Sequence, residues 1–386
     1  MNTNIFNEKL NKDFISNYFG KKYLYKKEMF ENTSNIMSLD ILNSILGISS
    51  NWNNKNFIMM LDKNLIKYND YSSLFLEQGG NFLRPDSEKV QNWVSKGASI
   101  ILNDINNVNS GIINISNQLQ NLTNGRCQGN LYFSMQSHQA FGPHFDTHDV
   151  FAIHFEGEKV WNIYENTENN PINHPLFKYS PEERIKKAGR MIDQITLKPG
   201  DLLYIPRGQY HDALASKNGS IHIAFGLDYF KPIDLMATMW EKFIINDFMR
   251  KDIDKNSTRE DLKNTLKDLS KELEKIINTD QTNEVLFDGI KKWPFETKEF
   301  SLNQIISEGR NYKVSKLIKI EKNEKQVYLT NGKDKVIIPD NYLDLTTYIL
   351  SQEFITYNSI NLHFKNLHEN IIKDALEKLE NMKVIY

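Results

Sequence analysis

Three residues in the middle of the chain have the types and spacing of a metal site. His144 and Asp146 are separated by one residue in the segment GPHFD (142–146), and His211 follows far downstream at the end of PRGQYH (206–211). Residues i and i+2 of a strand point to the same face, so His144 and Asp146 can ligate one ion, and His211 can join them from a neighbouring strand. Two imidazoles and one carboxylate on one face leave the opposite positions open. This is the ligand set of non-haem Fe(II) oxygenases.

A metal site of this kind also needs residues that hold a 2-oxo acid. Such an acid occupies two of the open positions, and its far carboxylate needs a cation. Lys159 follows the turn EGE (156–158) on a return strand and can supply that charge. Asn130 and Tyr132 share parity on an earlier strand, so both are expected to face the same cavity as hydrogen-bond donors. We therefore expect Lys159, Asn130 and Tyr132 to bind the cosubstrate.

Two further histidines lie on predicted strands, and the sequence leaves their roles open. His154 follows the run VFAI (150–153), and His222 lies in the run SIHIAFGL (220–227). Each imidazole could face the site from behind the ligands. Each could equally be a hydrogen-bonded histidine of the core.

Composition excludes several classes of protein. The 386 residues include 40% hydrophobic and 25% charged residues, which is enough apolar material for two or three ordinary globular domains. A net charge of −2 disfavours direct nucleic-acid binding driven by electrostatics. Residues 1–13 are polar, no apolar run approaches transmembrane length, and there is a single cysteine. We therefore expect a reducing, cytoplasmic setting and no association with a membrane.

Short segments rich in aromatic and β-branched residues follow one another from residue 129 to residue 230. Many short strands separated by turns predict a sandwich or barrel. Helices are expected before this region because apolar residues recur at helical spacing after capping residues. The expected helices span 38–46, 85–93 and 112–122, and the expected strands span 98–102, 131–135, 150–155, 159–164, 192–197, 201–205 and 220–227.

The chain after residue 231 has a different character. Residues 233–250 and 259–277 have helical periodicity, with much apolar area at Met236, Trp240 and Phe243. This area could be buried against a second subunit or against the parent barrel. The end of the chain combines helices with short strands, as a winged-helix module does, although a structural cap is the favoured interpretation. We divide the chain into a catalytic domain with N-terminal helical additions (1–230), a helical dimerisation segment (231–295) and a winged-helix-like domain (296–386).

Four segments together resemble one known family. They are YFS (132–134), FGPHFD (141–146), VFAIHFEGEKVW (150–161) and LKPGDLLYIPRG (197–208). In this order they resemble the JmjC-type cupin oxygenases that use Fe(II) and 2-oxoglutarate, in their ribosomal-oxygenase (cupin-4-like) branch. The resemblance is strongest over residues 90–230. The order of the later parts, helical segment and then winged-helix-like end, is also similar.

The resemblance implies an α+β protein with a double-stranded β-helix (jelly-roll) core that uses Fe(II), 2-oxoglutarate and O2. His144, Asp146 and His211 match the iron ligands of the family. Lys159 matches the residue that pairs with the C5 carboxylate of 2-oxoglutarate, and Asn130 and Tyr132 match an Asn-x-Tyr element of the same pocket. The expected function is hydroxylation of a side chain in a protein or peptide, with a ribosomal protein as one candidate and with a homodimer as the expected assembly.

Other functions remain open from the sequence. The same chemistry could act on a natural-product precursor peptide or on a small molecule. The cupin could instead be a non-catalytic scaffold, which the intact triad and Lys159 disfavour. Two departures from the family bear on the substrate. Residues 18–25 lack an aromatic, proline-containing signature, and His154 stands where glutamine is common.

Overall fold

The computed structural model of the protein describes most of the chain. The described residues are 6, 10, 12–77, 80–135, 141–215, 219–295, 297, 310–323, 326–330, 335–365 and 367–386. The chain splits into two compact units, Met1–Glu299 and Phe300–Tyr386. The expected boundary at residue 296 lies close to this division. The helical segment 231–295 falls in the first unit, and its separate role as a dimerisation segment stays a prediction.

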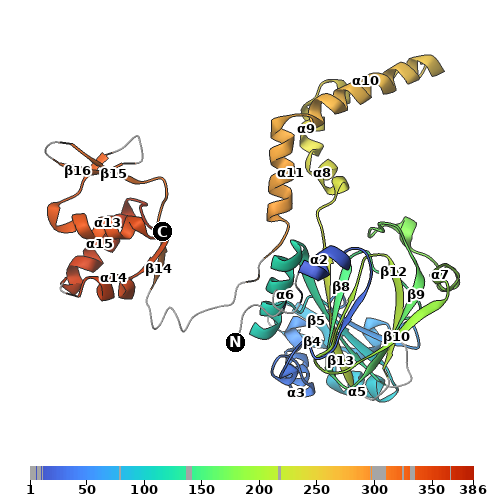
Figure 1. The fold of residues 1–386 in the computed structure, drawn as a ribbon. Coiled ribbons are helices and arrows are strands. Elements are labelled where there is room, and N and C mark those ends of the chain that lie inside the picture. Colours follow the sequence, from blue (N-terminus) through green and yellow to red (C-terminus); the bar gives the residue numbers. More distant parts are fainter. Residues whose placement is uncertain are drawn as a thin grey trace. The chain divides into compact units, whose positions relative to one another are not determined.

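Two antiparallel sheets form the centre of the first unit (Figure 1). The larger sheet has the order β1-β11-β8-β13-β7-β6-β2-β3, and the smaller sheet has the order β10-β9-β12. The strands of the larger sheet are β1 (Leu24–Lys26), β2 (Phe57–Leu61), β3 (Asn64–Leu65), β6 (Ser99–Leu102), β7 (Arg126–Ser134), β8 (Asp149–Glu156), β11 (Leu202–Ile205) and β13 (Ser220–Asp228). Those of the smaller sheet are β9 (Lys159–Thr167), β10 (Met191–Leu197) and β12 (Gln209–Ala215).

The core follows from the alternation of side chains along these strands. On β8, Val150 and Ala152 pack against apolar residues of the smaller sheet, such as Trp161 and Ile163. Phe151 and the other residues of opposite parity pack into a second cluster, on the outer face of the larger sheet. Both faces of β8 are therefore covered, which explains its nearly continuous apolar sequence. Two sheets that enclose a core in this way confirm the expected double-stranded β-helix.

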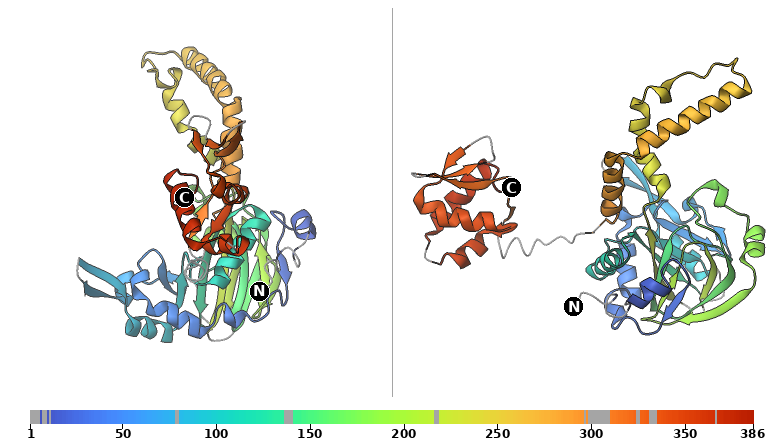
Figure 2. Two further views of the ribbon diagram at one scale, coloured as in Figure 1. Left: turned by 90° about the vertical axis from the view of Figure 1, so that its left-hand side faces the viewer. Right: turned by 45° about the horizontal axis from the view of Figure 1, so that its top comes forward.

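Helices cover the outer face of the larger sheet, and their ends match capping residues in the sequence. Asn109 accepts a hydrogen bond from the backbone of Ile112 at the start of α6, and Asn124 ends that helix with a φ of 56°. Figure 1 and Figure 2 show α6 beside the larger sheet, on the side away from β9 and β10. The helices before β7 are α2 (Lys12–Asn17), η1 (Thr33–Asn35), α3 (Leu39–Gly47), η2 (Ser49–Asn51), α4 (Tyr68–Tyr71), α5 (Ser87–Ser95) and α6 (Ser110–Thr123). The helices η3 (Pro175–Phe177) and α7 (Pro181–Ala188) instead connect β9 to β10 of the smaller sheet.

A hairpin that we did not predict precedes α5. It consists of β4 (Ser72–Glu77) and β5 (Gly80–Pro85). The alternation of apolar and polar residues that predicts a strand is absent from this segment. Apolar side chains occur on both faces of the hairpin, and several of them, including Leu76, are exposed.

The segment after the barrel is helical, but it is more broken than the sequence indicates. The single helix expected over 233–250 is divided into α8 (Pro232–Thr238), α9 (Trp240–Ile245) and η4 (Phe248–Arg250). Asn246 is extended and its side-chain oxygen accepts a hydrogen bond from the backbone of Met249, which competes with helix continuation. The helices α10 (Arg259–Ile277) and α11 (Asp280–Lys292) follow.

The second unit combines short strands with helices, and its description as a winged-helix-like domain stays a prediction. One sheet pairs β14 (Asn311–Lys313) with β18 (Phe354–Thr356), and a second has the order β15-β16-β17, with β15 at Lys319–Lys322, β16 at Val327–Thr330 and β17 at Lys335–Ile337. The helices are α13 (Asp340–Ser351), α14 (Tyr357–His363) and α15 (Glu369–Asn381). The end of the chain bridges back to the unit through Val314 and Ile385.

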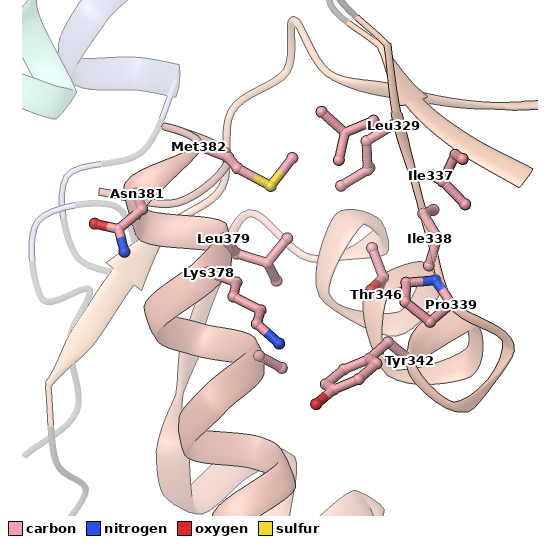
Figure 3. Close-up of a pocket in the computed structure, with 12 residues that line it drawn as sticks. Leu329, Ile337, Ile338, Pro339, Tyr342, Thr346, Lys378, Leu379, Asn381 and Met382 are labelled. Atoms are coloured by element: carbon pink, nitrogen blue, oxygen red, sulfur yellow. The ribbon is translucent and has the colours of Figure 1, made fainter.

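A cavity of about 370 Å³ lies in the second unit and is lined by residues of β16, β17, α13 and α15 (Figure 3). Apolar residues such as Leu329, Ile338 and Leu379 line most of it. None of the described residues around it is a histidine, cysteine or carboxylate. The described lining therefore lacks the usual ligands of a metal site.

None of the helices within the described ranges is long and apolar enough to cross a membrane. The cytoplasmic location expected from the sequence stays a prediction.

Candidate metal centre

The segment that carries His144 and Asp146 lies against the beginning of β12, which carries His211. The backbone N–H of His144 donates to the carbonyl of His211 at 3.0 Å, and the N–H of His211 donates back to His144 at 2.8 Å. The N–H of Gly208 also donates to the carbonyl of Asp146 at 3.0 Å. Three backbone hydrogen bonds therefore hold the two parts of the predicted triad together, although Asp146 and His211 are 65 positions apart in the chain.

The three side chains converge with a spacing that suits one ion. Their candidate ligand atoms all lie within 4.8 Å of one another. The Nε2 of His211 lies 3.5 Å from an Oδ atom of Asp146. Two atoms that each lie about 2.1 Å from one metal ion, with bonds at right angles, are about 3 Å apart. The observed spacing therefore needs only a small contraction on binding, and these residues fit a divalent transition metal.

Each imidazole is oriented by a hydrogen bond at its other nitrogen. The Nδ1 of His144 lies 2.9 Å from the carbonyl oxygen of Gly142, and the Nδ1 of His211 lies 3.0 Å from that of Gln209. With Nδ1–H donating to these carbonyls, each Nε2 presents a lone pair, which is the form that binds metal. Trp161 stacks near His211, with ring centroids 5.8 Å apart.

The electrostatics of the site favour the ligand forms of these groups. Burial, followed by the charge of His144, lowers the pKa of His211 to about 4. Burial alone would raise the pKa of Asp146, but the neighbouring His211, His148 and His144 outweigh it and hold that pKa below its usual value. At neutral pH the site therefore offers a neutral imidazole from His211 beside a carboxylate.

The three residues open into a cavity of about 160 Å³ inside the barrel. Lys159 and Tyr132 line the same cavity, as the sequence analysis expects. Asn130 is not among the residues that line it. The side-chain oxygen of Asn130 accepts a hydrogen bond from the backbone of Asp104 at 3.3 Å. The structure therefore brings five of the six candidate residues to one cavity.

Lys159 is a buried cation that lines this cavity away from the triad, since β9 pairs it with Ala215, four residues beyond His211 on β12. Only 5% of it is exposed, and its Nζ donates to the hydroxyl of Ser134 at 3.0 Å. Burial lowers the pKa of Lys159 to about 7. The Nζ also lies 5.9 Å from the centroid of the Tyr132 ring. A buried ammonium whose contacts among the described residues are a neutral hydroxyl and an aromatic ring is suited to receive an anion.

Two groups near the site were not singled out in the sequence. Ser134 has the parity of Tyr132 on β7, and this parity could have identified it. Asp149 is buried and accepts hydrogen bonds from the hydroxyls of Tyr204 (2.9 Å) and Tyr229 (3.1 Å) and from the backbone of Arg207 (2.8 Å). It joins the start of β8 to the turn before β12, a long-range connection with no local sequence signal.

The fold and the triad define a class of protein, and comparison with known families agrees with it. Residues 102–235 match the JmjC domain family. The match includes His144, Asp146, His211 and Lys159. Over these residues the chain is similar to the JmjC domain family, and the relatives and solved structures that it resembles are ribosomal oxygenases and histidyl-hydroxylases.

Two of these relatives show how far the similarity extends. The chain is 31% identical over 216 residues to the bifunctional lysine-specific demethylase and histidyl-hydroxylase NO66 of Dictyostelium discoideum. This match covers 55% of this chain and 39% of the relative. It is 40% identical over 84 residues to ribosomal oxygenase 2 of Bos taurus, which covers 22% of this chain and 17% of the relative. The chain thus matches less than half the length of these curated relatives.

A solved structure has the same fold over nearly the whole chain. It is YcfD, a ribosomal oxygenase from Escherichia coli, in complex with cobalt and 2-oxoglutarate. The TM-score is 0.52 at 17% sequence identity, and the match covers 97% of each chain. At this identity the likeness shows a shared fold.

Proposed function

We propose that the protein is an Fe(II)- and 2-oxoglutarate-dependent dioxygenase that hydroxylates an amino-acid side chain of a protein or peptide, with a ribosomal protein as the first candidate. One observation carries this proposal. Three metal-ligand side chains converge on a cavity that the buried cation Lys159 also lines, and the pairing of β9 with β12 places Lys159 opposite Ala215, four residues beyond His211. That arrangement matches a cosubstrate with a chelating 2-oxo acid at one end and a carboxylate at the other.

The proposed roles follow from this arrangement. His144, Asp146 and His211 hold Fe(II) on one face and leave the opposite positions open for cosubstrate and O2. Lys159 pairs with the far carboxylate, and Tyr132 lines the space between. The role of Asn130 in cosubstrate binding stays a prediction, because its side-chain oxygen bonds the backbone of Asp104.

Bound iron and 2-oxoglutarate supply the oxidising chemistry, in which 2-oxoglutarate becomes succinate and CO2 and one oxygen atom of O2 enters a C–H bond of the substrate. The protein orients these groups and excludes water from them. The walls of the cavity are apolar at Val150, Trp161 and Ala213, among others. Such walls strengthen the pairing of Lys159 with an anion, because charges interact more strongly where water is excluded.

The nature of the substrate is supported by the names of the relatives. They include a histidyl-hydroxylase and a ribosomal oxygenase. The test is a mass-spectrometric search for peptides that gain one oxygen atom after incubation of ribosomal proteins with the iron-loaded protein and 2-oxoglutarate. Oxidation that depends on 2-oxoglutarate at one residue supports the proposal. Modification of small molecules alone would move the substrate class to the alternative named from the sequence.

We also propose that the helical segment 231–295 joins two copies of the chain. None of the nineteen residues of α10 is buried. Several large apolar side chains of this segment are exposed, such as Trp240 (63%), Ile245 (77%) and Leu266 (64%). Burial of these side chains against a second copy would remove them from water, which favours association.

Light scattering tests this assembly. We expect a mass of two chains of 45.1 kDa for the native protein. Leu266→Glu together with Trp240→Glu should shift the mass toward one chain, whereas the control Lys267→Glu on the same helix should not. A native protein that scatters as one chain at micromolar concentration would contradict the proposed dimer.

A further inference from the structure

Three rings form a row across adjacent strands on the inner face of the larger sheet. His222 of β13 lies between Tyr132 of β7 and His154 of β8, and the strand registers place it directly opposite both. The rings of Tyr132 and His222 are 4.8 Å apart and nearly parallel, at 10°. The rings of His222 and His154 are 6.4 Å apart at 9°. The stack fixes the plane of the central imidazole.

His222 is buried, yet its polar atoms are not all satisfied. Only 3% of the residue is exposed, and its Nδ1 has no hydrogen-bond partner among the described residues. Buried polar atoms are almost always hydrogen-bonded, and an unpaired one is costly. His222 lines the same cavity as Lys159 and the metal-ligand residues. Its unfilled hydrogen-bonding capacity therefore lies beside the space that a ligand would fill.

The strand register places His222 toward the lysine end of the cavity, because His222 pairs with His154 near the end of β8, and β9 begins with Lys159 just after the turn that follows β8. The charges that act on each residue agree with this placement. The neighbours that act on Asp146 are His211, His148 and His144. Those that act on His222 are Lys159 and His154. His222 is thus coupled to the cation that would hold the far carboxylate.

The protonation states suit a hydrogen-bond donor rather than a second cation. Burial, and then the charges of Lys159 and His154, hold the pKa of His222 well below its usual value. Burial and Lys159 likewise lower the pKa of His154 to about 4, with Asp201 acting in the opposite direction. A neutral imidazole still carries one N–H. His222 can therefore donate to a carboxylate without repelling Lys159.

We infer that His222 is a specificity-determining residue of the cosubstrate site, where its imidazole N–H donates to the same far carboxylate that Lys159 neutralises. The inference rests on the proposed function, because it assigns His222 to the cosubstrate of that reaction. The consequence is selectivity: the pair His222 and Lys159 favours 2-oxo acids with a second carboxylate over those that lack one. His154 is a core residue of the row and lies outside the lining of the cavity.

The experiment compares two acids that share the chelating group. 2-Oxoglutarate and 2-oxobutyrate both chelate Fe(II) through a 2-oxo acid, but only 2-oxoglutarate has the second carboxylate. Each acid is titrated anaerobically into the Fe(II)-loaded protein, and binding is followed by the visible charge-transfer band. His222→Phe keeps a stacked ring and removes the N–H. It should raise the Kd for 2-oxoglutarate about 10- to 100-fold and leave that for 2-oxobutyrate unchanged.

Two further variants complete the design. His222→Gln retains an N–H donor and should recover most of the affinity for 2-oxoglutarate. His154→Leu changes the same residue type in the same row, outside the cavity, and should leave both affinities unchanged. Should His222→Phe fail to fold, His222→Leu tests the same loss with a smaller side chain, and circular dichroism confirms the fold of each variant.

The outcomes separate this inference from the proposed function. A native protein that gives no band with either acid would overturn the proposed function itself. A native protein that binds 2-oxoglutarate with an affinity unaffected by His222→Phe would overturn only the inference. Equal weakening of both acids would also overturn it, because His222 would then act on the metal end or on the fold.

Discussion

The two ends of the site cavity differ in how their polar groups are satisfied. At the metal end, both imidazoles already have a hydrogen-bond partner at Nδ1, and the segments that carry them exchange backbone hydrogen bonds. At the other end, the ammonium of Lys159 contacts the hydroxyl of Ser134, and the Nδ1 of His222 has no partner in the described part of the chain. One end is complete in the protein alone, and the other has room for an anion.

This difference in hydrogen bonding indicates what favours binding of the metal ion at one end and of the cosubstrate carboxylate at the other. The metal end is preorganised by the backbone, so few internal rearrangements are needed when the ion binds. The lysine end is destabilised by its own burial, and an anion would relieve this. Removing a metal ligand should therefore abolish binding, whereas changes at the lysine end should alter affinity by measurable factors.

The largest expected effect is at the metal end. His144→Ala or Asp146→Ala removes one of three ligands, and turnover of 2-oxoglutarate to succinate should fall to the background of the metal-free protein. The exposed-loop variant His174→Ala is the matched control and should keep full turnover. Folding of each variant is checked by thermal unfolding. Full succinate production by Asp146→Ala would show that another set of residues binds the iron.

The next effect in size is at the lysine end. Lys159→Met keeps the length and apolar stem of the side chain and removes its charge. Loss of one partner of a buried ion pair costs about 3–5 kcal/mol, so the Kd for 2-oxoglutarate should rise at least about 100-fold. The metal affinity should stay unchanged, which distinguishes the two ends. An unchanged requirement for 2-oxoglutarate would mean that another cation holds its far carboxylate.

A smaller effect is the dependence of 2-oxoglutarate affinity on pH. The pKa of Lys159 is about 7 in the empty protein, and an anion beside it favours the charged form and raises that pKa. Affinity should therefore be full below pH 7 and fall as the pH rises, by about tenfold per pH unit at most. The measurement is the ratio of the Kd values for 2-oxoglutarate and 2-oxobutyrate at pH values of about 6.5, 7.5 and 8.5, which bracket that pKa. A ratio that does not change, or that changes equally in Lys159→Met, would exclude Lys159 as the titrating group.

Much of the site was predictable because its geometry is set by strand periodicity. The i, i+2 spacing of His144 and Asp146 and the parity of Tyr132 are local properties, and the turns before His144 and His211 are visible as proline and glycine. Asn130 shows the limit of this reasoning. Asn130 shares the parity of Tyr132 but comes two residues earlier in β7. There the backbone N–H of Asp104 lies within reach and donates to the Asn130 side chain.

Other features depend on contacts that no local pattern encodes. His222 was left open because the face it presents is determined by the strands beside it, which come from distant parts of the chain. Asp149 acts through Tyr204, Tyr229 and a backbone N–H of the turn before β12. The helix expected over 233–250 breaks at Asn246 because its side chain takes over a backbone hydrogen bond.

The measurement that tests the central claim most directly is anaerobic titration of the protein with Fe(II) and 2-oxoglutarate. A 2-oxo acid that chelates ferrous iron gives a visible charge-transfer band. The account predicts this band in the native protein and its loss in His144→Ala. Retention of the band in His144→Ala, or no band and no bound metal in the native protein, would contradict the assignment of His144, Asp146 and His211 as the iron site.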